Sequence, residues 1–229
     1  LLLWLTVRSP RPPAPAVPVA RATRENWRTT LGELLKTPSF LLIVLAGTLA
    51  GVMGYAIGTW NPSFLIRSHG SSLQDAGLLI GLGGGITSTV GTLMCGSITD
   101  RLVARDAGWQ LGVPLLACLI SVPLGLAFYL WPTGIAFQLG AMAIPEAYLF
   151  YLGFSFAATW WAVPCFGAIS HLFPPNRLAQ ATALFVMSMT LFGVGLAPIV
   201  VGGLSDFFAA SVGKEALRYA LSGSVMLYV

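Results

Sequence analysis

The residues of this chain best suited to chemistry are three charged side chains in one short turn, Asp100, Arg101 and Arg105. They follow an uncharged stretch from Gly77 to Thr99. A helix of that length, rising about 1.5 Å per residue, crosses a hydrocarbon layer of about 30 Å. A carboxylate at the membrane edge can pair locally with a guanidinium group, or it can dock on the positive end of another helix. Both interpretations describe a contact and not a bond-breaking step.

Other reactive patterns are missing from the sequence. There is no H-E-x-x-H motif, no pair of aspartates and no G-x-S-x-G motif within the apolar runs, so we expect no enzyme. Cys95, Cys118 and Cys165 lie in apolar runs without C-x-x-C spacing, and we expect them to be small packing residues. We therefore expect neither a metal site nor a cofactor. A channel would show a filter loop or a ring of charges, and neither is visible.

The composition indicates a membrane protein. Only 9% of the residues are charged, 56% are hydrophobic, and the mean hydropathy is +0.80. Soluble domains carry about 25% charged residues. The net charge of +4 comes from basic residues in short loops, so we expect a lipid bilayer as partner and no nucleic acid. The fold class is therefore an all-α integral membrane protein.

The uncharged runs divide the chain into three parts. Residues 1–7 resemble the last turns of a helix, and residues 8–36 form a proline-rich loop that ends in a short amphipathic helix or, alternatively, in plain loop. Residues 37–229 form the transmembrane bundle. Its expected spans, the last one cut short, are Lys36–Arg67, Gly77–Thr99, Gln110–Trp131, Glu146–Phe173, Leu178–Leu204 and Ala216 onward, with a partly apolar connection at Pro132–Pro145.

Small residues follow two of these spans at helical spacing. Gly77, Gly81 and Gly85 form one row, and we expect a neighbouring helix to pack closely against it. A second row of glycines lies along one face of the first span, and polar side chains lie along the adjacent face of the same helix. The members of the second row are Gly47, Gly51, Gly54 and Gly58.

Basic residues predict the orientation. Nine of the twelve fall on one side of the predicted membrane and three, Arg67, Lys214 and Arg218, on the other. The positive-inside rule makes the richer side cytoplasmic.

A short repeat suggests internal symmetry. The pentad Gly96–Asp100 recurs as Gly202–Asp206, and each closes the middle helix of a predicted three-helix set. The orientation above places the two pentads on opposite sides of the membrane. Inverted-topology repeats of this kind are common in secondary transporters.

The pentad and the arginines after it resemble the loop motif G-x-L-A-D-R-x-G-R-[RK] of the major facilitator superfamily. Val103 and Ala104 depart from the motif. The segments Tyr55–Phe64 and Pro174–Ala183 resemble parts of bacterial spinster-like members of that superfamily. On this resemblance the chain is the C-terminal six-helix bundle, helices 7 to 12, of a carrier built from inverted three-helix repeats. The absent partner is the N-terminal six-helix bundle.

The resemblance implies secondary transport by alternating access in the inner or plasma membrane. Spinster-like members move small organic or amphipathic, lipid-like solutes, and proton coupling is expected from the N-terminal half. No Asp, Glu, Lys or Arg lies deep within a predicted span of this chain, which agrees with the expectation that the proton-coupling groups belong to the N-terminal half. Two alternatives stay open: an efflux carrier for drugs or organic anions, and a structural or regulatory protein that does not transport.

The resemblance also assigns roles to individual residues. Helices 7 and 10 line the central cavity in the superfamily, and plain packing or membrane-belt positions are the alternative for each residue. The expected cavity residues are Tyr55, Thr59, Asn61, Ser155, Thr159 and Trp160. Gly96, Asp100, Arg101 and Arg105 are expected to form the cytoplasmic gate motif, and Gly202 and Asp206 its repeat equivalent.

Overall fold

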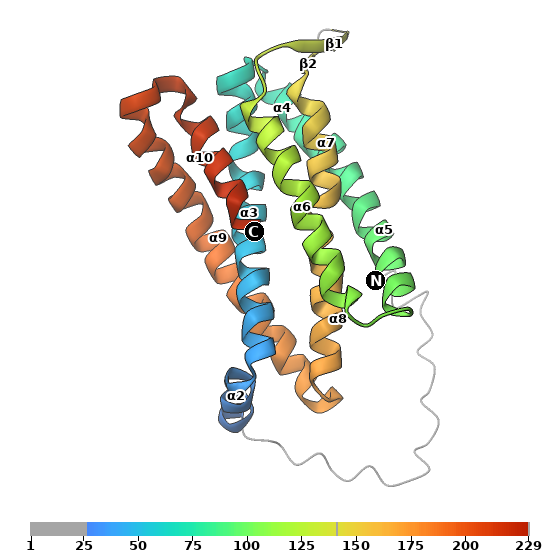
Figure 1. Ribbon diagram of the computed structural model, residues 1–229. Coiled ribbons are helices and arrows are strands. Elements are labelled where there is room, and N and C mark those ends of the chain that lie inside the picture. Colours follow the sequence, from blue (N-terminus) through green and yellow to red (C-terminus); the bar gives the residue numbers. More distant parts are fainter. Residues whose placement is uncertain (1–26, 141, 229) are drawn as a thin grey trace, which may run out of the picture.

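The structure is a computed structural model that describes residues 27–140 and 142–228, mostly as helices (Figure 1). The expected helix end at 1–7 and most of the expected central loop lie outside these residues. The elements are, in chain order, α2 (Trp27–Lys36), α3 (Pro38–His69), α4 (Leu73–Leu78), the π-helix η1 (Leu79–Gly84), α5 (Gly85–Val103), α6 (Trp109–Leu130), β1 (Ile135–Leu139), β2 (Met142–Pro145), α7 (Ala147–Ala157), α8 (Ala162–Leu172), α9 (Pro175–Val212), the 3-10 helix η2 (Gly213–Glu215), α10 (Ala216–Val225) and the 3-10 helix η3 (Met226–Tyr228).

The long helices run side by side and confirm the predicted all-α membrane fold. Five segments of the described chain are long and apolar enough to cross a membrane. The last of these five reverses direction at Gly213, whose φ of 58° lies in the left-handed region that glycine adopts easily. In Figure 1, α10 accordingly returns alongside α9. The five segments are Pro38–His69, Leu73–Val103, Trp109–Leu130, Ala147–Leu172 and Pro175–Tyr228.

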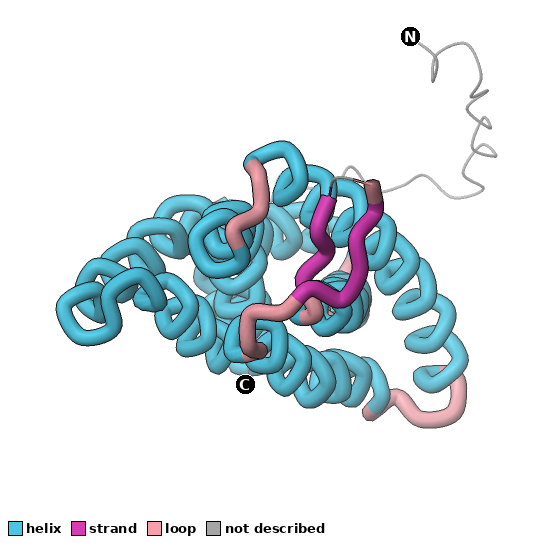
Figure 2. Tube along the Cα trace, turned by 90° about the horizontal axis from the view of Figure 1, so that it is seen from above, coloured by secondary structure: helices cyan, strands magenta, loops and turns pink. Residues whose placement is uncertain are grey.

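A β-hairpin replaces the simple connection that the sequence predicts before α7. Strands β1 and β2 pair antiparallel, and Gly140 turns between them with φ 64°. The amide of Glu146 donates to the carbonyl of Gly134 at 3.0 Å and joins the two ends of the hairpin. Figure 2 shows the hairpin lying across one end of the bundle. A glycine between two short apolar runs was the available signal.

Helix α3 packs closely against α9, and the two helices run in the same direction. A Cβ atom at Gly47 would overlap the ring of Phe185, and one at Gly51 would overlap the side chain of Met189. Gly193 in turn accommodates the ring of Tyr55. Part of the expected glycine row on α3 is therefore a packing face, whereas Gly54 and Gly58 of the same row have nothing within 4 Å.

The predicted packing row on the second span meets no neighbouring helix within the described residues. At Gly77, Gly81 and Gly85, an added Cβ atom would meet nothing within 4 Å. Helix α7 instead approaches a neighbouring face of η1 and α5, where a Cβ at Gly84 would overlap Tyr151 and one at Gly91 would overlap the backbone of Phe156. Spacing by four residues did not indicate this second face, because several faces of this segment carry glycine.

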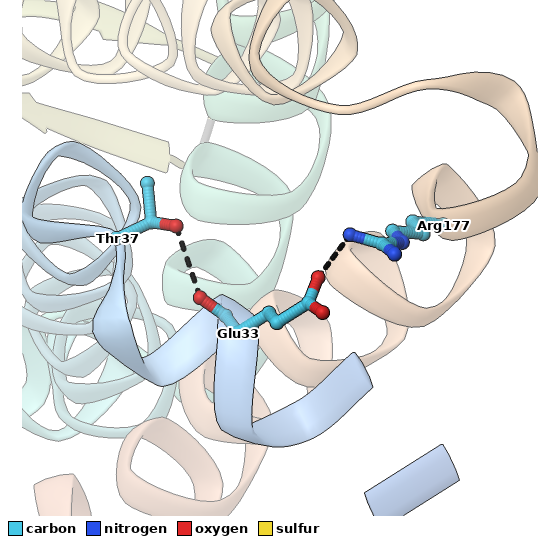
Figure 3. A network of polar contacts seen from close by, with 3 residues as sticks. All are labelled: Glu33, Thr37 and Arg177. Carbon is cyan, nitrogen blue, oxygen red and sulfur yellow. Dashed lines mark hydrogen bonds and ion pairs between the residues drawn. The ribbon is translucent and has the colours of Figure 1, made fainter. Parts of the chain in front are cut away.

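The short helix α2 is attached to the cytoplasmic end of the bundle as oriented by the positive-inside rule. The side chain of Leu34 is 2% exposed and belongs to a buried cluster with Phe40 and Phe185. Glu33 forms an ion pair with Arg177 at the start of α9, and its carbonyl accepts a hydrogen bond of 3.0 Å from the hydroxyl of Thr37 (Figure 3). An exposed ion pair of this kind contributes at most about 1 kcal/mol to stability. Burial of the Leu34 side chain therefore contributes most of the free energy that holds α2 on the bundle.

The close approach of α5 and α7 predicts a contrast between two glycine-to-alanine substitutions. Gly91→Ala should destabilise the complete protein by about 1–3 kcal/mol, because its Cβ meets backbone that cannot rotate away. Gly85→Ala should be neutral or stabilising by up to about 1 kcal/mol, because the site is open and alanine favours helix. Thermal unfolding in detergent measures both. Equal effects from the two substitutions would contradict the packing described here.

Candidate substrate cavity and gate motif

A cavity of about 350 Å³ lies between α3, the α7–α8 pair, α9 and η3. Its wall is mostly apolar, made of aromatic rings and small or aliphatic side chains with a few hydroxyl groups, and none of the residues that line it is charged. Such a wall suits an uncharged apolar group with a few polar atoms. The lining residues are Ala50, Gly51, Gly54, Tyr55, Ile57, Tyr151, Phe154, Ser155, Ala158, Thr159, Trp161, Met189 and Tyr228.

The structure brings three of the six expected cavity residues to this wall: Tyr55, Ser155 and Thr159. Thr59 lies one turn beyond Tyr55, is exposed, and donates its hydroxyl to the carbonyl of Tyr55 at 2.9 Å. Trp160 is not among the lining residues, whereas its neighbour Trp161 is. The resemblance assigned Trp160 to the wall, and the structure places its neighbour Trp161 there instead.

Asn61 lies apart from the cavity, in an aromatic core. Its side chain is fully buried, and its Oδ1 accepts a hydrogen bond of 2.6 Å from the hydroxyl of Tyr129 on α6. The ring of Phe64 packs edge-on against both Phe128 and Tyr129 at about 5 Å. The amide nitrogen of Asn61 is buried with no hydrogen-bond partner among the described residues. Asn61 therefore links α3 to α6.

Hydroxyl groups of α7 and of the turns that follow it are directed at the backbone of the neighbouring span. Ser155 donates to the carbonyl of Gly84 at 3.0 Å, and Thr159 reaches the carbonyl of Ser88 at 3.4 Å. Nearer the hairpin, Tyr148 donates to the carbonyl of Leu79 at 2.8 Å. Two hydroxyl groups of the cavity wall are thus already engaged with protein, which fixes their side chains in place.

The predicted span from Glu146 to Phe173 is not one continuous helix. Helix α7 ends at Ala157, α8 begins at Ala162, and the residues between them form turns. This break forms part of the cavity wall through Ala158, Thr159 and Trp161. Discontinuous membrane helices are typical of transporter binding sites, because irregular backbone is tolerated where it lines a cavity.

Sequence reasoning missed several of the residues that define the cavity. Tyr151 was detectable, because it lies four residues before Ser155 and eight before Thr159 on the same helical face. Met189 and Tyr228 come from segments that carry no local signal. Their place at the wall follows from the packing of α9 and the return of α10.

The residues of the gate motif lie at the end of α5, away from the cavity. Asp100, Arg101 and Arg105 are all exposed. Within residues 27–140 and 142–228, no side-chain hydrogen bond or ion pair involves any of these three groups. The local pair suggested as an alternative is therefore not formed within the described chain. At Gly96, one turn before Asp100, an added Cβ atom would meet nothing within 4 Å.

The second pentad differs in its local setting. Helix α9 continues past Asp206 to Val212, so this pentad does not close its helix as predicted. Asp206 is exposed, and a Cβ at Gly202 would lie 3.1 Å from the ring of Trp60. The pentads nevertheless lie near opposite ends of the bundle, because α5 and α9 run in opposite directions (Figure 1).

Comparisons with known proteins agree with this architecture. The sequence matches the Major Facilitator Superfamily over residues 1–198, and the chain belongs to this superfamily of membrane transporters. An MFS-type efflux pump from Mycolicibacterium smegmatis (strain ATCC 700084 / mc(2)155) is 33% identical over 224 residues, which are 96% of this chain and 48% of the pump. Protein spinster homolog 3 from Danio rerio is 26% identical over 90% of this chain and 42% of its own length.

A solved structure gives the same fold. A bacterial homologue of the human lysosomal transporter Spinster, in an inward-facing and unoccupied conformation, matches with a TM-score of 0.76 and 20% identity. The match covers 99% of this chain and 53% of that chain. The present chain thus spans about half the length of the relatives that it matches.

The buried contact between Asn61 and Tyr129 predicts a non-additive pair of substitutions. Tyr129→Phe should destabilise the protein by about 1–3 kcal/mol, because it leaves the Asn61 oxygen buried without a donor. Replacing both partners, as Asn61→Leu with Tyr129→Phe, should cost less than the sum of the single changes. A double-mutant cycle in thermal unfolding measures the coupling. Additive losses would show that the hydrogen bond contributes nothing.

Proposed function

We propose that this chain forms one half of a secondary active carrier that moves a small organic or amphipathic, lipid-like solute across a cell membrane by alternating access. The observation that carries the proposal is the uncharged aromatic cavity at the break between α7 and α8, in a chain that belongs to a transporter superfamily. Membership of that superfamily points to transport and not to catalysis. The inner or plasma membrane is the proposed location.

The second wall of the pathway is proposed to come from an N-terminal six-helix bundle. The relatives are about twice as long as this chain, which supports that arrangement. None of the lining residues is ionisable near neutral pH, so a proton-coupling group belongs to the other bundle in this proposal. The apolar part of the solute would contact the aromatic wall described here.

Export of an organic compound is the second candidate. The M. smegmatis relative is named an efflux pump and aligns over nearly the whole chain, which favours this direction of transport. The same cavity serves either candidate. The two candidate functions differ in the solute that is moved and in the direction of transport.

Reconstitution of the complete transporter that contains this chain tests the proposal. Liposomes should take up or release one class within a panel of lysolipids, organic anions and cationic dyes, with a rate that depends on an imposed proton gradient. Ala158→Trp should abolish transport, because residue 158 lines the cavity. Ala209→Trp, an exposed position on α9 away from the cavity, is the matched control. Normal transport by Ala158→Trp would contradict the proposed pathway.

The exposed gate motif supports a more specific proposal. Asp100 would dock on a helix end of the other bundle and stabilise the state that is closed to the cytoplasm, since it has no partner in the described chain. Asp100→Asn keeps the shape of the side chain but removes its charge. We expect the substitution to destabilise the cytoplasm-closed state by about 0.5–2 kcal/mol relative to the inward-open state. A change of 1.4 kcal/mol shifts the ratio of the two states about tenfold.

Spin-label distances across the two cytoplasmic faces of the complete transporter measure that balance. Asp100→Asn should shift the population toward the inward-open form and slow turnover, with normal insertion into the membrane. Asp206→Asn, near the opposite end of the bundle, should leave the cytoplasmic distances unchanged. An unchanged distance distribution for Asp100→Asn would rule out the docking role.

A further inference from the structure

The break between α7 and α8 leaves the backbone carbonyl of Trp160 without a donor from its own helix. Pro164 is the third residue of α8 and has no N–H group. In a continuous helix, residue 164 would donate to the carbonyl of Trp160, four residues earlier. A carbonyl freed inside a membrane bundle needs another donor, because no water is available in the hydrocarbon region.

Cys95 on α5 supplies that donor. Its Sγ lies 3.2 Å from the carbonyl oxygen of Trp160, and its side chain is fully buried. The same sulfur lies 3.7 Å from the hydroxyl oxygen of Thr99. The thiol reaches the break because Gly91, one turn earlier, lets the backbone of Phe156 approach α5 without a Cβ atom between them.

Two further contacts hold the break on either side of this bond. The hydroxyl of Thr159 lies 3.2 Å from the carbonyl of Phe156 and 3.4 Å from that of Ser88. The hydroxyl of Tyr228 donates to the carbonyl of Ala158 at 3.4 Å. The position of the break decides which indole faces the cavity: Trp161 lines it, and Trp160 does not. The Trp160 ring packs against Phe156 at 5.4 Å.

We propose that Cys95 is a positioning residue for the transport cavity. It is not among the residues that line the cavity, and it acts through the carbonyl of Trp160, which it holds so that Thr159 and Trp161 keep their places at the wall. This role rests on the proposed function, in which the cavity receives the solute. A thiol that only filled space would be replaceable by alanine without effect on affinity.

Hydrogen–deuterium exchange of the complete protein tests the contact independently of transport. Cys95→Ala should speed exchange in peptides that cover residues 158–165 about threefold to tenfold, the effect of losing one hydrogen bond. Cys95→Ser keeps a donor and should restore slow exchange. Thr89→Ala is the matched control, because Thr89 is exposed on the same helix, lies outside the gate motif and donates to the carbonyl of Gly85 in its own helix at 2.7 Å.

Transport kinetics test the positioning role. With the solute found in the reconstitution panel, Cys95→Ala should raise KM by about threefold to tenfold and change the maximal rate by less than about twofold. Cys95→Ser should bring KM back toward the wild-type value, and Thr89→Ala should leave it unchanged. The amount of protein inserted in the membrane is measured for every variant.

The outcomes separate this inference from the proposed function. Unchanged exchange in Cys95→Ala overturns the inference, whatever the transport result. Faster exchange with an unchanged KM, or a KM that Cys95→Ser fails to restore, overturns the positioning role and leaves a structural contact. Absence of transport by the wild-type protein overturns the proposed function and with it the role in transport, while the exchange measurement still decides whether the thiol holds the break.

Discussion

Hydrogen bonding of the backbone inside an apolar bundle is the constraint on which the rest of this structure depends. Wherever a π-helix or a proline interrupts a spanning helix, the freed carbonyl must find a donor from protein. At the α7–α8 break that donor is the thiol of Cys95 on α5. Other side chains also donate to backbone carbonyls of adjacent helices: Tyr148 and Ser155 of α7 reach η1, and the indole of Trp60 reaches the carbonyl of Pro198 at 3.2 Å. These bonds fix neighbouring helices relative to one another, and the cavity wall is built from the same segments.

Length and hydropathy were sufficient to predict the spanning helices and their alternation, because uncharged runs of this size have few other stable structures in lipid. The packing faces were harder to predict. Glycine occurs on several sides of the second span, so spacing alone favoured Gly81 and Gly85, whereas Gly84 and Gly91 meet the neighbouring helix. Which side is buried depends on the partner helix, and that information lies some 70 residues away along the chain, as in the pair Ser155 and Gly84.

The candidate site was partly predictable for the same reason. Positions on one helical face of α7, such as Tyr151 and Ser155, follow from a period of 3.6 residues. The choice between Trp160 and Trp161 does not, because the turns after Ala157 reset the phase of the helix. Asn61 illustrates a different limit. A polar residue beside a proline in a span is equally suited to a cavity and to a buried hydrogen bond, and only the position of Tyr129 distinguishes them.

The parallel packing of α3 and α9 has a consequence for the order of assembly. Parallel neighbours cannot be joined by a short turn, so the chain must cross the bundle through α5, α6 and the α7–α8 pair before α9 can meet α3. At a synthesis rate of about 5–20 residues per second, Met189 leaves the ribosome between roughly 7 and 28 s after Gly51, with which it packs. During that interval the glycine face of α3 contacts lipid or the insertion machinery. A nascent chain interrupted before α9 therefore leaves the glycine face of α3 without the helix that packs on it.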